Sequence, residues 1–350
     1  MLHILSPWRK QANSEFNNPT INPVFIGGWQ MTSGSQKSIV IKKATGAKIT
    51  TVIDNYIDTL LSSNERVKRA PLAKGNVRRP PLLAEHGFSV LVEVVGDSVP
   101  HRVLMDFGVS NIGVPHNLKV LEIDLDRIEA FVVSHGHHDH VGAVSEVLGT
   151  LSRKQLPVVV HPDAFLSTRF HKFPDGNKVP IPCLKKGVIE KTGNETIDGR
   201  SPVLLASDYV LALGEIPRIN DFEKGIPSAY YEKDGEIYKD HIIDDKGIVL
   251  DIKDKGLVVI TGCGHSGIIN TLRHAQEITG VEKIYCVAGG FHLIGNMGEV
   301  IIKRTVKEMK KIDPEMIVPC HCTGLKALQK FEKAFPEAFV LNAAGTTIHI

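Results

Sequence analysis

Residues 130–140 read Ala-Phe-Val-Val-Ser-His-Gly-His-His-Asp-His. The first five residues are uncharged and mostly apolar, as in a buried strand, and the next six hold four histidines and a carboxylate. Imidazole and carboxylate groups are preferred ligands of zinc, and they also bind iron or manganese. Packing alone does not explain a strand that runs directly into so many such side chains, so this stretch predicts a metal site.

The spacing of these side chains predicts two ions rather than one. His135 and His137 point the same way from an extended backbone, so both can bind one ion. A turn after them would let Asp139 and His140 face a second ion a few ångströms away.

Three neighbouring residues are interpreted from the same spacing. Gly136 and Gly142 are expected to give the backbone freedom where it bends sharply, and His138 is expected to face away from the ions. The alternative is a surface histidine cluster that binds no metal, but such a cluster would rarely follow a buried strand directly.

The amino-acid composition limits the classes to which the protein can belong. The 350 residues are 42% hydrophobic and 23% charged, and 41 basic against 39 acidic residues leave a net charge of +2. No broad basic field is therefore expected to recruit nucleic acid or an anionic membrane.

No segment approaches the roughly 18 apolar residues of a membrane span. Five irregularly placed cysteines do not suggest a disulfide framework, so a cytoplasmic protein is expected. Nothing in the sequence indicates an oligomeric state.

The chain divides into an N-terminal extension, residues 1–46, and a single domain, residues 47–350. Strands are predicted where β-branched runs end at turn formers: Lys48–Asn55, Ser89–Val95, His101–Asp106, Val158–Val160, Ile248–Ile252, Leu257–Ile260, Lys283–Ala288, Met316–Val318 and Phe339–Leu341. Helices are predicted by apolar residues at three- and four-residue spacing: Val141–Gln155, a short helix capped by Asp163 that ends at Phe170, Ile269–Ile278, Val300–Ile312 and Leu325–Phe335.

This order of elements indicates the fold class. Strands come first in hairpins and then alternate with helices, and the pattern occurs twice along the chain. It predicts an α+β fold, an αββα sandwich in which two mixed sheets pack together with helices outside. A polar stretch around 215–245 has the length of an insert that lies over a site.

The histidine-rich stretch resembles the signature of a known family. Residues 134–142, Ser-His-Gly-His-His-Asp-His-Val-Gly, resemble the signature of the metallo-β-lactamase superfamily. Asp106, in Leu-Met-Asp-Phe-Gly, matches the Asp-x-Gly that ends a strand in that superfamily. The resemblance implies an αββα sandwich with a dinuclear metal site at the sheet edge.

Further motifs narrow the resemblance to one branch of the superfamily. They are Glu-His-Gly-Phe-Ser at 85–89, Thr-Gly-Cys-Gly-His-Ser-Gly at 261–267, Gly-Gly-Phe-His-Leu at 289–293 and Pro-Cys-His-Cys-Thr-Gly at 319–324. Together they resemble the 7,8-dihydropterin-6-ylmethyl-4-(β-D-ribofuranosyl)aminobenzene 5′-phosphate synthase-like proteins. The resemblance runs from about Lys48 to the C-terminus.

The resemblance implies the remaining metal ligands. His265 corresponds to the third ligand of the first ion, and His321 to the last ligand of the second. The alternative for His265 is a polar residue at the N-terminus of a helix. Cys263 stands where many superfamily members carry a bridging aspartate. It either binds or bridges the ions as a thiolate, or is simply a small buried residue. Cys320 and Cys322 are expected to face away from His321 if the chain stays extended there.

Other residues are candidates for contacts with the substrate. His292 follows a predicted strand through two glycines, and three roles are open for it: binding of a substrate phosphate, proton donation, or metal coordination. A purely structural histidine is the alternative. By analogy with the branch, His86 and Asn55 are expected to line the pocket. Asp139 is expected to orient a catalytic water in addition to binding metal.

Two reactions fit this set of residues. The first is hydrolysis of a small phosphorylated or ester substrate through a metal-bound hydroxide. Two divalent metal ions are expected for it, with zinc as the preferred metal and iron, manganese or magnesium as alternatives. The second, implied by the branch, is a synthase reaction in which pyrophosphate leaves a dihydropterin methylene carbon as an arylamine-type nucleophile attacks. A non-catalytic metal-binding protein is the third possibility. Fold alone does not choose among them.

Overall fold

The computed structural model describes residues 38–96, 99–294 and 298–350. Most of the predicted N-terminal extension, residues 1–37, therefore lies outside the described residues. The part of the extension that is described packs against the domain: Ile39 and Ile41 are buried, and the Ile39 N–H donates to the Ile278 carbonyl at 2.7 Å. No helix in the described ranges is both long and apolar enough to cross a bilayer.

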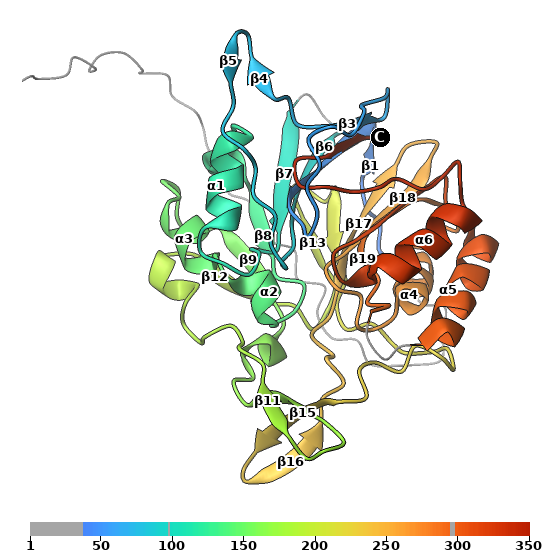
Figure 1. The fold of residues 1–350 in the computed structure, drawn as a ribbon. Coiled ribbons are helices and arrows are strands. Elements are labelled where there is room, and N and C mark those ends of the chain that lie inside the picture. Colours follow the sequence, from blue (N-terminus) through green and yellow to red (C-terminus); the bar gives the residue numbers. More distant parts are fainter. Residues whose placement is uncertain (1–37, 97–98, 295–297) are drawn as a thin grey trace, which may run out of the picture.

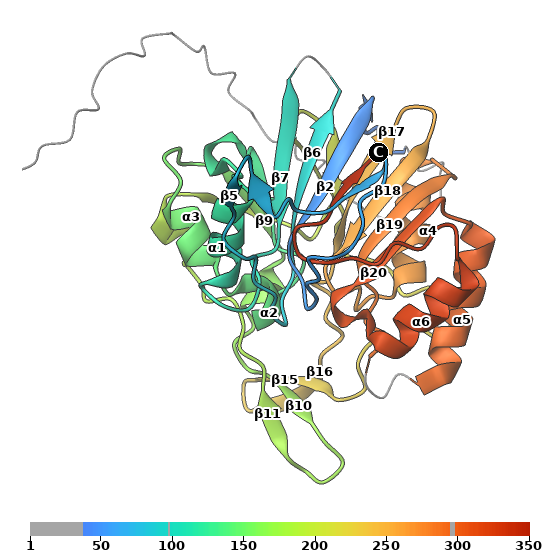
Figure 2. The ribbon, with the colours of Figure 1, turned by 45° about the horizontal axis from the view of Figure 1, so that its top comes forward.

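Two large sheets form the centre of the molecule (Figures 1 and 2). One has the strand order β12-β9-β8-β7-β6-β2-β21-β3. Its strands are β2 Gly46–Ile53, β3 Val67–Lys68, β6 Ser89–Val95, β7 Pro100–Met105, β8 Ala130–Val132, β9 Pro157–Val160, β12 Glu195–Asp198 and β21 Thr347–His349. The other has the order β13-β14-β17-β18-β19-β20, with β1 beside β17. Its strands are β1 Lys43–Ala44, β13 Val203–Leu205, β14 Val210–Ala212, β17 Gly247–Ile252, β18 Gly256–Thr261, β19 Ile284–Gly290 and β20 Met316–Cys320.

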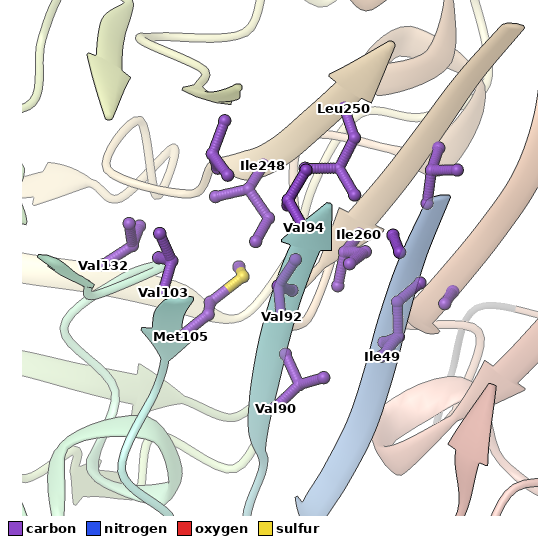
Figure 3. Packing of buried hydrophobic residues seen from close by; sticks show 14 of the residues in the cluster. Ile49, Val90, Val92, Val94, Val103, Met105, Val132, Ile248, Leu250 and Ile260 are labelled. Carbon is purple, nitrogen blue, oxygen red and sulfur yellow. The ribbon is translucent and has the colours of Figure 1, made fainter. Parts of the chain in front are cut away.

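Alternation along the strands builds the layers, because successive side chains of a strand point to opposite faces. Val103 and Met105 of β7 join Ile248 and Leu250 of β17 in one buried cluster between the sheets (Figure 3). The intervening Leu104 points outward into a second cluster with two helices, α1 Gly113–Val120 and α3 Val144–Gly149. This arrangement is that of the predicted αββα sandwich.

The opposite outer face is covered by the C-terminal helices (Figure 2). These are α4 Ile268–Thr279, α5 Gly298–Ile312 and α6 Leu325–Ala334. Leu272 of α4, Met309 of α5 and Phe331 of α6 are buried in a third cluster, which also contains Val249 and Val259 from the outward-facing positions of β17 and β18. The three predicted helices in this half lie close to their expected bounds.

Three local predictions are wrong. The helix predicted over 141–155 is shorter and is preceded by a separate turn of helix, α2 His138–Val141. The helix predicted to end at Phe170 is a 3-10 turn over Pro162–Phe165, capped by the His161 side chain, and the chain then enters a strand. Phe339 makes only an isolated bridge to Ile317, so the strand predicted there does not form.

A small four-stranded sheet projects from the sandwich (Figures 1 and 2). It contains β10 Arg169–Lys172, β11 Lys178–Pro180, β15 Ala229–Lys233 and β16 Glu236–Lys239, in the order β11-β10-β15-β16. The stretch expected as an insert, 215–245, supplies two of its strands, and the segment 169–180 supplies the other two. A short hairpin of β4 Ala73–Lys74 and β5 Val77–Arg78 is separate from all three sheets.

Parallel pairing gathers the predicted site residues at one edge. Strand β7 runs parallel to β8, and β18, β19 and β20 run parallel to one another. Their carboxyl ends therefore share an edge of each sheet. Residues 106, 135, 263, 292 and 321 follow the ends of these five strands in that order.

Candidate metal centre

The first donor set forms where the segment after β8 meets the segment after β18. The ligand atoms of His135, Cys263 and His265 all lie within 4.8 Å of one another. The Nε2 atoms of His135 and His265 are 3.1 Å apart, and all three side chains are buried. Two ring nitrogens aimed at each other at this distance suit a shared ion.

His137 lies beside this set. Its ring centroid is 4.6 Å from that of His135 and 4.9 Å from that of His265. Its Nε2 atom is buried and has no hydrogen-bond partner among the described residues. Because a buried polar atom without a partner is costly, this nitrogen fits a metal ligand better than a packing residue.

The second donor set contains Asp139, His140, Cys263 and His321, again within 4.8 Å of one another. His140 Nε2 is 3.2 Å from Cys263 Sγ and 3.1 Å from His321 Nε2. Helix α2 produces this arrangement, because its first turn places Asp139 and His140 inside and leaves His138 exposed, as predicted. Cys263 belongs to both sets.

Asp106 orients His140 from behind. Its Oδ2 is 2.6 Å from His140 Nδ1, and it also accepts from the Ser134 N–H and hydroxyl, each at 2.7 Å. The carboxylate therefore favours the proton on Nδ1 and leaves Nε2 free to face the centre. Asp106 adopts φ of 64°, an uncommon backbone conformation for a residue other than glycine, as is seen at functional sites.

We expect Asp106→Asn to weaken metal binding by about 10- to 100-fold while the chain stays folded, because the amide no longer fixes the His140 tautomer. Competition with a chromophoric chelator measures this change. Asp251→Asn is the matched control. Asp251 is also a buried carboxylate, but it lies on strand β17 and pairs with Lys43 at 3.5 Å. Equal affinity in the Asp106 variant and the wild type would contradict this role.

Asn55 orients His321 in a similar way. The Asn55 Oδ1 atom is 3.2 Å from His321 Nδ1, and the Asn55 amide donates to the His321 carbonyl at 3.1 Å. The His86 side chain is 61% exposed, and its ring stacks on His321 with centroids 5.3 Å apart. His86 Nε2 also lies 3.8 Å from Asp139 Oδ2. His86 and Asn55 thus lie at the open side of the centre.

The protonation states of most of these groups suit metal binding, which needs neutral imidazoles and an ionised carboxylate. His140 is the exception, because burial lowers its pKa but Asp106 and Asp139 outweigh this effect and raise the pKa to about 9, so its ring would give up a proton when a metal binds. Burial lowers the pKa of His137 to about 3 and holds those of His135 and His265 well below the ordinary value. Burial opposes the charge of Asp139, but His140 and His321 outweigh it and lower the Asp139 pKa below its usual range.

Gly136 and Gly142 serve a different purpose from the predicted one. Neither has a positive φ, and Gly142 has ordinary helical angles. A Cβ on Gly136 would lie 2.2 Å from the Ala164 carbonyl oxygen, and one on Gly142 would lie 2.2 Å from that of Val109. Close approach of neighbouring backbone, rather than bending freedom, requires glycine here.

The prediction for Cys322 is wrong. The chain does not stay extended after β20, because His321 adopts φ of 49° and a 3-10 turn covers His321–Thr323. Cys322 therefore turns toward the centre, where its Sγ lies within 4.8 Å of ligand atoms of Cys263 and His292. The Thr-Gly that follows Cys322 is the one sequence signal for this turn, since Gly324 has φ of 81°.

Two buried charged residues behind the site were also missed. Asp244 accepts the Gly136 N–H at 2.8 Å, between the candidate ligands His135 and His137. Arg169 binds Asp244 through two hydrogen bonds, at 3.0 and 2.6 Å. Only the folded chain brings these segments together, so no local pattern points to them.

Comparison with known proteins is consistent with this geometry. The chain is 32% identical over 272 residues, 77% of its length, to the 7,8-dihydropterin-6-methyl-4-(β-D-ribofuranosyl)-aminobenzene-5′-phosphate synthase of Methanocaldococcus jannaschii, and covers 91% of that protein. It is 31% identical over 79% of its length to the uncharacterized protein MJ0448 of the same organism, and covers 97% of it. No family model matches the chain.

A solved structure shares the fold. Tm1679, a metal-dependent hydrolase of the β-lactamase superfamily, superposes with a TM-score of 0.64 and 26% sequence identity. The match covers 87% of this chain and 99% of Tm1679. The similarity therefore extends over the sandwich and both of its sheets.

Proposed function

The chain belongs to the metallo-β-lactamase superfamily, in the branch of the dihydropterin-linked aminobenzene phosphate synthase-like proteins, and we propose that it is a metal-dependent hydrolase of a small phosphorylated or ester substrate. Imidazole and carboxylate groups surround the Cys263 thiol, and this arrangement carries the proposal. Such a donor set at the edge of a sandwich suits reactions in which negative charge develops on a phosphoryl or carbonyl oxygen.

Two divalent ions are proposed for the centre, and zinc is the preferred metal. Imidazole and thiolate ligands favour zinc over magnesium or manganese, which prefer oxygen. The proposed ligands are His135, His137 and His265 for one ion, Asp139, His140 and His321 for the other, and Cys263 for both. Two observations support the assignment: the buried Nε2 of His137 has no hydrogen-bond partner in the described part of the chain, and the Nε2 atoms of His135 and His265 face each other.

The residues of the chain have distinct parts in the proposed reaction. Bound divalent ions would lower the pKa of a water molecule and neutralise charge on the substrate. The ionised Asp139 carboxylate would accept a hydrogen bond from the attacking water and so orient its lone pair toward the substrate. His86, exposed beside Asp139, would contact the substrate, and Asn55 would hold His321 in place.

A second candidate function follows from the relative with 32% identity. In the synthase reaction, the bond between a dihydropterin methylene carbon and a pyrophosphate oxygen breaks, and pyrophosphate departs with the electron pair. An arylamine-type nucleophile then bonds to that carbon and gives up a proton. The same centre would neutralise the charge of the leaving pyrophosphate.

One assay separates the two candidates. The zinc-loaded protein is incubated with dihydropterin pyrophosphate, with and without a ribosylated arylamine phosphate. We expect phosphate or pyrophosphate to be released at the same rate in both samples, as in hydrolysis. Release that requires the arylamine, together with a coupled pterin–arylamine product, would instead establish the synthase reaction.

Asp139→Asn is the control for this assay. It keeps the shape of the side chain and removes the charge, so we expect turnover to fall by at least about 100-fold. Turnover that survives complete chelation of the metal would contradict both candidate functions.

A further inference from the structure

A third group of potential ligands adjoins the two donor sets. Cys263, His292 and Cys322 place one ligand atom each within 4.8 Å of one another, and both cysteines are at most 3% exposed. The Cys322 thiol donates to the Cys263 carbonyl at 3.3 Å. The ring of His292 lies 4.2 Å from that of His265, measured between centroids. The group is therefore continuous with the centre.

The backbone holds these side chains in place at a cost. His292 and His321 adopt φ of 43° and 49°, a region that residues with a Cβ rarely occupy. The Thr323 hydroxyl accepts the Phe291 N–H at 3.1 Å and so ties the two loops together. Such strain persists where the surrounding structure fixes it, and it is concentrated at functional sites.

Glycine at position 290 makes room for Cys322. A Cβ on Gly290 would lie 2.6 Å from Cys322 Sγ and 3.1 Å from Cys263 Cα. That Cβ would also lie 2.4 Å from the Gly262 carbonyl oxygen, so any larger residue would collide with both loops. The strand end is thus shaped to bring the two sulfur atoms near each other.

The His292 ring supplies the nitrogen ligand of this group. Its Nδ1 is buried and has no hydrogen-bond partner within the part of the chain that the structure describes. One nitrogen of the His292 ring lies within 4.8 Å of both sulfur atoms, and of the three roles open for His292 this placement favours metal coordination. The cysteines are free thiols, so both sulfur atoms are available as ligands.

We propose that Cys263, His292 and Cys322 form a third metal position, which shares Cys263 with the two donor sets and prefers a thiophilic divalent ion such as Zn²⁺. Two sulfurs and one imidazole nitrogen are a known type of zinc ligand set, and three protein ligands leave a fourth position for water or a substrate atom. The proposal rests on the metal centre of the proposed function and extends it. Oxygen-preferring ions such as Mg²⁺ would not occupy this position.

Cobalt loading tests the proposal without recourse to activity. Protein kept reduced and free of oxygen is loaded with Co²⁺, a stand-in for Zn²⁺, and elemental analysis counts the bound ions. We expect one ion for each of the three donor sets in the wild type, together with a sulfur-to-cobalt charge-transfer band in the near ultraviolet. Cys322→Ser and His292→Ala should each bind one ion fewer, and Cys322→Ser should also weaken the band.

Cys286→Ser is the matched control, because Cys286 is equally buried but lies between the two sheets in the hydrophobic core. It should keep the ion count and the band of the wild type. Circular dichroism confirms that each variant is folded. Two ions in both the wild type and Cys322→Ser, with equal bands, would overturn the third position and leave the dinuclear centre standing. A wild type that binds no ion would overturn both.

Discussion

His137→Ala is expected to remove metal and activity together. The variant loses the buried Nε2 atom that lies beside His135 and His265 and has no partner among the described residues. Loss of a group that merely orients a ligand costs about 10- to 100-fold in metal affinity, so loss of a ligand itself should cost at least about 100-fold. Elemental analysis after dialysis, and turnover measured on the same sample, check the result.

His138→Ala is the matched control for this variant. His138 is the next residue along the chain and has the same side chain, but it is exposed to solvent on the first turn of α2. We expect it to keep both metal and turnover. A His137→Ala protein that is fully active while free of metal would refute the metal centre itself, because no ligand role would then be left to explain the histidine cluster.

The predictable part of the site has a physical explanation. His135, His137, Asp139 and His140 stand within six residues of one another after a buried strand, so their chemistry and their spacing are visible together. The strands were predictable for a similar reason, since a run of β-branched residues that ends at turn formers is a local signal. His265 became predictable only through the resemblance of its motif to that of a family.

The remaining features depend on contacts between distant segments. Cys322 enters the site because the chain turns at His321, and a strand pattern does not encode a positive φ at a histidine. Asp244 and Arg169 are 75 residues apart and meet only after folding. A single charged residue in a sequence is most often on the surface, so their burial could not be inferred from local patterns.

The buried pair of Arg169 and Asp244 connects the projecting sheet to the candidate metal centre. Arg169 begins β10, is 2% exposed, and binds Asp244 through both terminal nitrogens. Its Nε also lies 2.8 Å from Asp240 Oδ2. Asp244 in turn accepts the Gly136 N–H, so the guanidinium supports the backbone that carries His135 and His137. Burial alone would raise the Asp244 pKa, but the Arg169 charge outweighs this effect and holds the Asp244 pKa below its usual range.

Arg169→Met should therefore destabilise the metal-free protein by about 3–5 kcal/mol, because it leaves Asp244 buried without its counter-charge. Urea unfolding of chelated protein measures the loss apart from any contribution of bound metal. Arg200→Met is the control, since Arg200 pairs with Asp198 at the surface, where the two side chains are 55% and 50% exposed. That pair should contribute at most about 1 kcal/mol. Equal unfolding midpoints for the two variants would mean that Arg169 does not compensate the buried charge, and that Asp244 is neutral in the folded chain.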